Sequence, residues 1–119
     1  MILLTMFFLH IVDDYYLQQG ILAQIKQKKF WEENAPEDKY KYDYIWALIM
    51  HAFSWTFMVM LPLFFVSTMP MFVIYLVFIA NVAVHAYVDD LKANKLKINL
   101  WEDQLIHLAQ IILTVGILY

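Results

Sequence analysis

The stretch His10-Ile11-Val12-Asp13-Asp14-Tyr15-Tyr16-Leu17-Gln18 places an imidazole, two carboxylates and an amide inside an otherwise apolar segment. If the segment is helical, His10, Asp14 and Gln18 lie four residues apart and line one face. An ionised aspartate inside a membrane costs on the order of 2.5–3.5 kcal/mol or more when it has no partner. We therefore expect the other polar interruptions of the chain to be partners for this stripe.

The composition indicates a membrane protein with a single domain. Hydrophobic residues make up 63% of the 119 residues and charged residues only 16%, which is more apolar surface than a soluble domain of this size can bury. The apolar runs are continuous and do not alternate as in a transmembrane barrel, so helices are expected. The net charge of −3 gives no electrostatic case for nucleic acid. The absence of cysteine excludes disulfides and thiolate metal sites.

Four transmembrane helices are expected, at about residues 2–28, 44–65, 71–92 and 100–118. The clean apolar run of the first helix is about 12 residues, or roughly 18 Å, which is too short to cross lipid alone. This helix is therefore expected to continue through its polar groups to about Gly20, with residues 21–33 as an extension in the headgroup layer. Pro62 is expected to kink or end the second helix, and Asn99 to cap the fourth.

The lysines predict how these helices are oriented. All eight lysines lie in, or at the margins of, the segments that join the first helix to the second and the third to the fourth. By the positive-inside rule these two segments are cytoplasmic and both termini are non-cytoplasmic. The start of the chain lacks a basic region and a small-residue cleavage site, so we expect it to remain as a membrane helix. The expected fold is an all-α, polytopic four-helix transmembrane bundle, with the lipid bilayer as its environment.

Each expected helix carries one histidine, and three of the histidines have an aspartate four residues away: His10–Asp14, His85–Asp89 and Asp103–His107. The order is reversed in the last pair, which lies on a helix that runs in the opposite direction. All three pairs therefore place the aspartate on the cytoplasmic side and the histidine about 6 Å deeper. His51, on the second helix, falls near the same level. Four histidines and three aspartates are thus expected to converge in one layer.

This convergence predicts a metal site. Helical bundles build metal sites from imidazoles and carboxylates at such spacings, and these ligands suit divalent Zn, Mn or Fe. Seven candidates exceed the need of one tetrahedral ion, so they suit two ions, or one ion with a general base and carboxylates behind the ligands. Interhelical hydrogen bonding is the alternative role. The expected ligands are His10, Asp14, His51, His85, Asp89, Asp103 and His107, and the expected catalytic carboxylates are Asp14, Asp89 and Asp103.

Other polar side chains are expected beside this layer, in contact with substrate or behind the ligands: Gln18, Lys26, Asn81, Lys92 and Gln104. Lys26 and Lys92 either mark the headgroup level or bind an anionic group of a substrate. Asp13 and Asp90 lie one residue off the ligand face, so they are expected behind the ligands or at the interface.

The ordered motifs resemble those of a family of small bacterial and phage membrane proteins of unknown function. They are His10-x-x-x-Asp14-x-x-x-Gln18, Ala23-x-x-Lys26, His51, His85-x-x-x-Asp89-x-x-Lys92 and Asp103-Gln104-x-x-His107, which together cover nearly the whole chain. That family is distantly similar to proteins named membrane-bound metal-dependent hydrolases. The resemblance implies a bacterial inner-membrane protein with a hydrolytic metal site. The chain departs from the usual pattern at Gln19-Gly20, where a turn with proline is commoner, and in having a single histidine in its second helix.

Three functions stay open at this point. A metal-dependent hydrolase would use a metal-bound water against a lipid or a phosphoester. A proton or metal-ion pathway through a homo-oligomer would also use intramembrane His and Asp, although the outer halves of the helices look almost wholly apolar. A non-enzymatic membrane partner protein would use the polar layer only to fix helix register.

Overall fold

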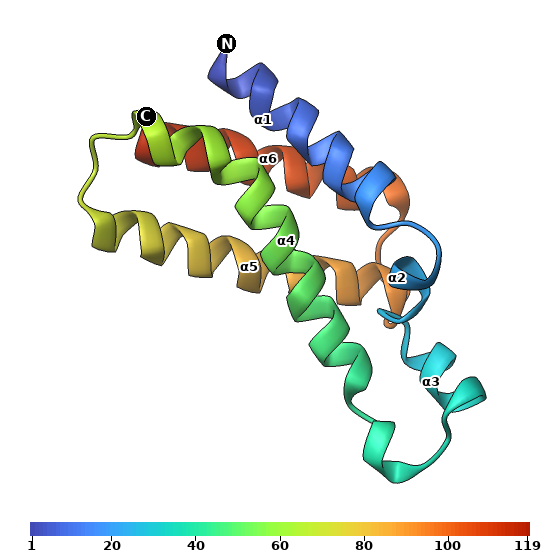
Figure 1. Cartoon of the computed structure of the whole chain (residues 1–119). Helices are drawn as coiled ribbons and strands as arrows, with labels where there is room; N and C mark the ends of the chain where they lie inside the picture. Colours follow the sequence, from blue (N-terminus) through green and yellow to red (C-terminus); the bar gives the residue numbers. More distant parts are fainter.

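The computed structural model describes all 119 residues, and every regular element in it is helical (Figure 1). The α-helices are α1 (Ile2–Ile11), α2 (Ile21–Gln24), α3 (Lys28–Asn34), α4 (Asp43–Val66), α5 (Met71–Ala93) and α6 (Leu100–Leu118). A π-helical turn, Val12–Leu17, continues α1, and a short 3₁₀ turn, Asp38–Tyr40, precedes α4. The prediction of an all-α fold is confirmed.

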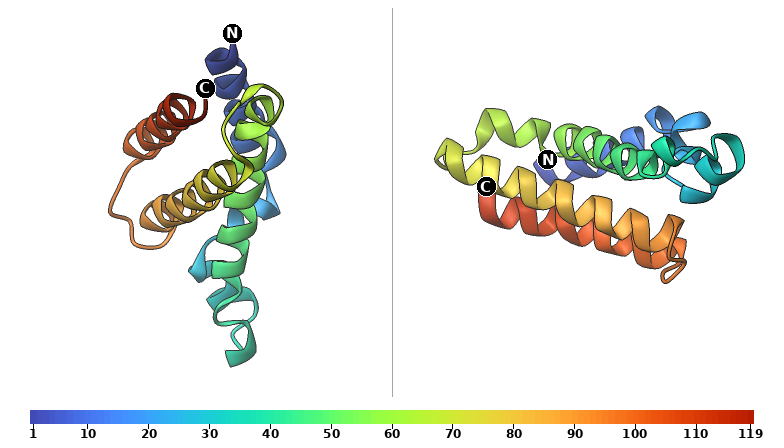
Figure 2. Two further views of the ribbon diagram at one scale, coloured as in Figure 1. Left: turned by 90° about the vertical axis from the view of Figure 1, so that its left-hand side faces the viewer. Right: turned by 90° about the horizontal axis from the view of Figure 1, so that it is seen from below.

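The four longer helices pack together, and the α2–α3 segment lies to one side (Figures 1 and 2). Helix α5 contacts both α4 and α6, and α1 lies against α4 and α6. Short connections at 67–70 and 94–99 make α4, α5 and α6 consecutive antiparallel neighbours. The 24 residues of α4 correspond to about 36 Å of helix, and the N-terminal part of α4 extends beyond α1, α5 and α6, toward α3 (Figure 1).

The first expected helix does not continue to residue 28. The π-helical turn ends at Leu17, and Gly20 adopts φ +64°, a conformation that glycine reaches without steric cost. The chain therefore turns and forms the short helices α2 and α3. Lys26 lies in the turn between these two helices, and not on a membrane helix.

The boundaries expected for the other helices agree more closely with the structure. Pro62 lies inside α4, which continues to Val66, so it does not end the helix. Asn99 caps α6 as expected: its side chain accepts the Glu102 N–H at 3.0 Å, and its own N–H donates to the Glu102 carboxylate at 2.8 Å. This capping box satisfies two backbone donors at the start of the helix.

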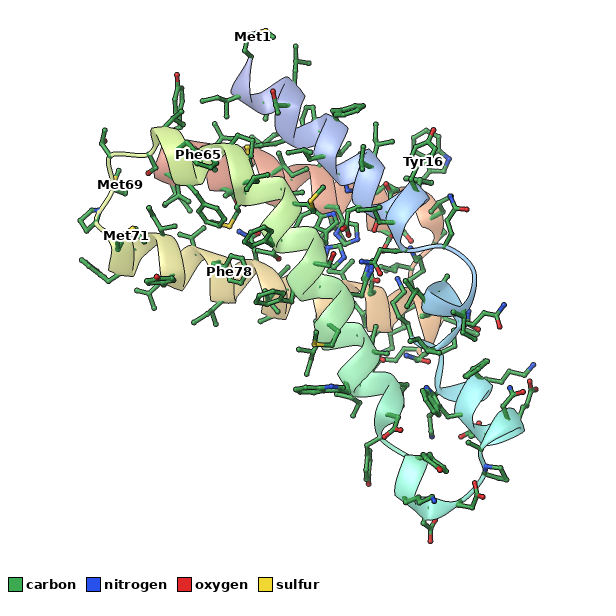
Figure 3. All side chains as sticks on the ribbon, in the orientation of Figure 1. Met1, Tyr16, Phe65, Met69, Met71 and Phe78 are labelled. Carbon is green, nitrogen blue, oxygen red and sulfur yellow. The ribbon has the colours of Figure 1, made fainter.

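Much of the surface is apolar, and half of the 22 buried residues are polar. Large hydrophobic side chains such as Phe65 (82% exposed) and Phe72 (65%) point outward, and Figure 3 shows such side chains along the outer faces of the helices. Seven of the eleven buried polar residues are His or Asp with at most 4% exposure, namely His10, Asp13, His51, His85, Asp89, Asp103 and His107. Two helical stretches, 38–66 and 71–93, are long and apolar enough to cross a membrane.

An apolar core fills the end of the bundle where α4 ends and α5 begins. Its buried members are Met6, Trp55, Val59, Met60, Leu63, Ile74, Ile111 and Leu118. These residues belong to α1, α4, α5 and α6, so the start of α1 and the end of α6 lie at the same end of the bundle. All eight lysines lie in the segments at the other end.

Candidate metal centre

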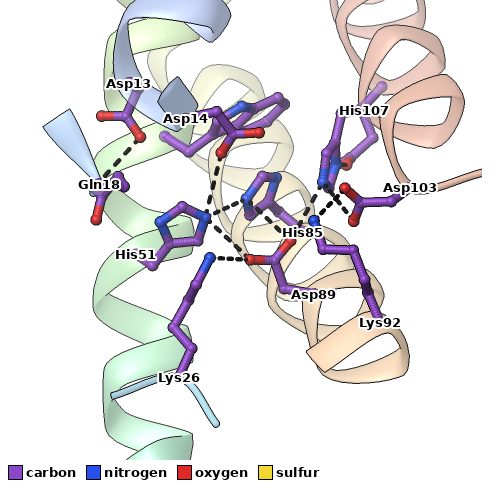
Figure 4. A network of polar contacts seen from close by, with 12 residues as sticks. Asp13, Asp14, Gln18, Lys26, His51, His85, Asp89, Lys92, Asp103 and His107 are labelled. Atoms are coloured by element: carbon purple, nitrogen blue, oxygen red, sulfur yellow. Dashed lines mark hydrogen bonds and ion pairs between the residues drawn. The ribbon is translucent and has the colours of Figure 1, made fainter. Parts of the chain in front are cut away.

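Beyond this apolar core, toward the lysine end, the helices bring together the seven residues of the expected layer. All of them except His10 are labelled in Figure 4. We call them the His/Asp cluster: His10, Asp14, His51, His85, Asp89, Asp103 and His107. The Asp14 side chain is 13% exposed, and each of the other six residues is at most 4% exposed. The pairs from α5 and α6 meet although their His–Asp order is opposite, because the two helices are antiparallel.

Asp89 is the carboxylate that touches most of the histidines. Its Oδ2 lies 3.1 Å from His51 Nε2, and its Oδ1 lies 3.3 Å from His107 Nε2 and 3.7 Å from His85 Nε2. The Lys26 ammonium also donates to Oδ2, at 2.8 Å. Asp89 therefore links α4, α5, α6 and the α2–α3 turn.

The donor atoms lie at the spacing that ligands of one ion require. A tetrahedral zinc ion with ligands about 2.0 Å away places those ligands about 3.3 Å from one another. His51 Nε2 is 3.1 Å from His85 Nε2 and 3.5 Å from Asp14 Oδ1. Two groups have donor atoms within 4.8 Å of one another and could hold an ion: Asp14–His51–His85 and His85–Asp89–His107. His85 belongs to both groups.

A chain of hydrogen bonds fixes which nitrogen of His107 carries its proton. The Gln110 amide nitrogen donates to the backbone carbonyl of Asn81 at 3.2 Å, so the Gln110 oxygen must face His107 Nδ1, at 3.2 Å. Nδ1 is therefore the protonated nitrogen. The Asn81 amide in turn donates to Thr114 Oγ1 at 2.8 Å. This is the outer support that orients metal-binding histidines in proteins.

The opposite nitrogen of His107 is left facing negative charge. His107 Nε2 lies 3.3 Å from Asp89 Oδ1 and 3.3 Å from Asp103 Oδ1, and it is buried without a hydrogen-bond partner. Three electron-rich atoms at this spacing repel one another unless a cation, either a proton or a metal ion, lies among them. The residues present therefore fit a bound cation.

His10 has a different role from the other three histidines. The Trp55 indole N–H donates to His10 Nδ1 at 2.7 Å, and His10 Nε2 then donates to the Gln104 side-chain oxygen at 3.1 Å. Both ring nitrogens are used, so His10 offers no free lone pair to an ion. It instead orients Gln104, whose amide nitrogen donates to Asp14 at 3.3 Å and to Asp103 at 3.1 Å.

The π-helical turn changes which residues share a face on the first helix. The Gln18 backbone N–H donates to the Asp13 carbonyl, five residues earlier, and the Gln18 amide donates to the Asp13 carboxylate at 3.4 Å. Gln18 therefore bonds to Asp13 and not to Asp14, whereas His10 and Asp14 stay in contact, with His10 Nδ1 3.9 Å from Asp14 Oδ2. Asp13 is fully buried and also accepts a hydrogen bond from Ser54 at 2.8 Å. It lies behind the cluster, as expected.

The cluster opens at the lysine end into a cavity of about 440 Å³, which we call the lysine cavity. Its polar lining is Asp14, Gln18, Lys26, Gln27, Asp89, Lys92 and Gln104. Lys92 donates to Asp103, which itself lies behind the cavity wall. Of the five flanking residues expected from the sequence, four line this cavity. The fifth, Asn81, lies on the opposite side and supports Gln110.

Asn94 positions Lys26 at this cavity. Its amide donates to the Lys26 carbonyl at 3.1 Å and to Asp90 at 2.8 Å, and its oxygen accepts the Lys28 N–H at 2.7 Å. The end of α5 is thereby joined to the α2–α3 turn. Asp90 also pairs with Lys95 at 3.0 Å, and this hydrogen bond raises the pKa of Lys95. Asp90 thus lies outside the cluster, as expected.

Sequence reasoning missed Trp55, Ser54, Gln110, Thr114 and Asn94. Trp55 covers the cluster on the apolar side: its ring stacks on His85 with centroids 4.2 Å apart, and it is 1% exposed. Two of these residues had a detectable signal. Trp55 follows His51 by four residues, and Gln110 follows His107 by three, so each shares a helix face with a candidate ligand.

The charged groups of the cluster and cavity do not cancel. Three carboxylates (Asp14, Asp89 and Asp103) face two ammonium groups (Lys26 and Lys92), so among these five side chains one carboxylate has no ammonium partner. A buried charge of this sign favours uptake of a cation.

Comparison with protein families, curated proteins and solved structures found no match to the chain.

Proposed function

We propose that the protein is a membrane-embedded, metal-dependent hydrolase whose His/Asp cluster binds one divalent cation. The observation that carries the proposal is His107 Nε2, which is buried, unpartnered and flanked by two carboxylate oxygens at 3.3 Å. His51, His85, Asp89 and His107 are the proposed ligands. Because His85 belongs to both candidate groups, we propose one ion per chain. Zn, Mn or Fe suits imidazole and carboxylate ligands.

The proposed chemistry is hydrolysis of a lipid or a phosphoester. A bound divalent ion lowers the pKa of a ligated water and so supplies a nucleophile at neutral pH. Asp14 is the proposed general base, because it lines the lysine cavity and contacts His51 at 3.5 Å. Gln104 holds the other Asp14 oxygen at 3.3 Å. Asp103 is proposed to supply a fixed negative charge beside the ion and not to act as the base, since Lys92 and Gln104 already bond to one of its oxygens.

We further propose that four helical segments cross a bacterial inner membrane. The stretches 38–66 and 71–93 are long and apolar enough. The 19 residues of α6 correspond to about 28 Å, close to the thickness of the hydrocarbon core. The apolar exterior and the buried carboxylates support this arrangement. With every lysine at one end, that end is proposed to be cytoplasmic and both termini non-cytoplasmic.

The test is the metal content of the full chain purified in detergent. We expect about one divalent ion per chain in the wild type and loss of that ion in His85→Ala. Tyr87→Ala, at a 58% exposed position on the same helix, is the control and should keep the ion. A wild-type protein without bound ion after loading with Zn, Mn and Fe in turn would refute the proposal, as would a His85→Ala variant that retains it.

Ion transport is the second candidate, because the outer half of the bundle is less apolar than the sequence indicated. Gln110, Asn81 and Thr114 form a hydrogen-bonded path that leads from His107 away from the lysine end. A proton or metal ion could use this path in a homo-oligomer. Flux in proteoliposomes that is lost in both Asp14→Asn and Thr114→Val would favour transport. Hydrolysis predicts that Thr114→Val leaves turnover largely intact.

A further inference from the structure

A second hollow lies next to the lysine cavity. It is a groove of about 660 Å³ between the first and last helices, and we call it the α1–α6 groove. Its apolar lining includes Phe7, Ile11, Tyr16 and Leu108, and His10 and Gln104 are its polar lining residues. Tyr15 and Gln104 line both the groove and the lysine cavity. A molecule with one polar end and one apolar end could therefore occupy both hollows.

The groove has a direction that suits a lipid chain. Tyr15 lies beside the lysine cavity and Phe7 lies eight residues earlier on the same helical segment, so the groove extends about 12 Å away from the lysine end. If that end is cytoplasmic, the groove leads from the headgroup level toward the middle of the bilayer. A third hollow, of about 470 Å³ between α4 and α5, has only hydrophobic residues in its wall. It offers nothing to a polar headgroup.

The charges of the lysine cavity favour an anion once a divalent ion is bound. Lys26 and Lys92 each bond to a cluster carboxylate, Asp89 and Asp103 respectively. A divalent ion would share the charge of those carboxylates and would make the site more positive. Both ammonium groups would then face the cavity with less of their charge compensated. Paired lysines beside a metal ion are suited to phosphate oxygens.

We propose that the substrate is a phosphate-bearing anionic lipid, with its phosphate between Lys26 and Lys92 and an acyl chain in the α1–α6 groove. This inference rests on the proposed function, since it names the substrate class of the same site. The shared Tyr15 and Gln104 connect the two binding regions. The groove contributes affinity that a free phosphate ion lacks, and the lysines contribute affinity that a zwitterionic lipid lacks.

Binding to the metal-loaded full chain in detergent tests the proposal, with dioleoyl phosphatidic acid, dioleoyl phosphatidylcholine and inorganic phosphate as probes. We expect phosphatidic acid to bind at least about tenfold more tightly than either other probe, a difference of about 1.4 kcal/mol. Leu108→Trp and Ile11→Trp place a larger side chain in the groove from α6 and from α1. Each should weaken the binding of phosphatidic acid about tenfold and leave the binding of phosphate unchanged. Leu105→Trp, at a 59% exposed position one turn away, should change neither.

Equal binding of phosphatidic acid and phosphatidylcholine would overturn the proposal, and so would phosphate binding as tightly as phosphatidic acid. Unchanged lipid binding in both groove variants would refute the assignment of the groove. Metal content measured on the same samples separates this failure from failure of the proposed function. A protein that retains its ion but does not discriminate between the lipids refutes only the inference, whereas a protein that binds no ion refutes the function.

Discussion

Replacing Asp89 and, separately, its neighbour Asp90 by asparagine compares two carboxylates that are adjacent in sequence and opposite in environment. Asp89 is 2% exposed and contacts His51, His107 and Lys26. Asp90 faces Asn94 and Lys95 at the surface. Asparagine preserves the size of the side chain and removes the negative charge. The two variants therefore differ in which charge is removed, and hardly in packing.

The expected magnitudes follow from these contacts. Asp89→Asn leaves the Lys26 ammonium, on a side chain only 14% exposed, without its anion, and breaking a buried pair costs about 3–5 kcal/mol. Asp90→Asn removes a surface pair with Lys95, whose side chain is 45% exposed, and such pairs contribute about 0–1 kcal/mol. Losing a residue behind a ligand costs about 10–100-fold in metal affinity. Loss of Asp89, as a ligand, should therefore cost more than about 100-fold.

Two assays measure these differences. Thermal unfolding in detergent, followed by tryptophan fluorescence without added metal, gives the stability of each variant relative to the wild type. Competition with a chelator of known affinity gives the metal dissociation constant. We expect Asp89→Asn to lose much of both its thermal stability and its metal affinity, and Asp90→Asn to change little in either. Equal metal affinity in the two variants would refute the reasoning that makes Asp89 the central ligand.

Three further substitutions have expected outcomes. Gln110→Leu releases the proton-bearing nitrogen of His107 and should weaken metal binding about 10–100-fold, as measured by chelator competition; unchanged affinity would show that the tautomer is held by something else. Gly20→Ala should destabilise the fold by about 1–3 kcal/mol, because φ is +64° at Gly20, and thermal unfolding would show no shift if this backbone were relaxed. Trp55→Phe removes the indole N–H from His10 and should cost about 1 kcal/mol; a neutral effect on unfolding would argue against that hydrogen bond.

Helical periodicity was enough to predict which residues form the cluster. The His–Asp spacing of four residues places both side chains of a pair on one helix face, and the reversed pair on α6 is required by its antiparallel direction. These relations depend only on helix geometry and chain direction, so they could be read from the sequence. The all-α fold and the capping role of Asn99 depend on similarly local features.

The remaining features depend on geometry that the sequence does not display. In the π-helical turn the backbone hydrogen bond of Gln18 spans five residues instead of four, so Gln18 bonds to Asp13 and not to Asp14. No residue type in the sequence signals this turn. The use of both His10 nitrogens depends on how α4 is rotated, since that rotation brings Trp55 to the ring. Lys26 reaches Asp89 only because Gly20 reverses the chain and Asn94 holds the following turn.

The measurement that tests the central claim most directly is anomalous diffraction at the absorption edge of the metal, from crystals of the metal-loaded protein. The account predicts one anomalous peak per chain, among His51, His85, Asp89 and His107. A peak outside the His/Asp cluster, or loaded crystals with no peak, would contradict it.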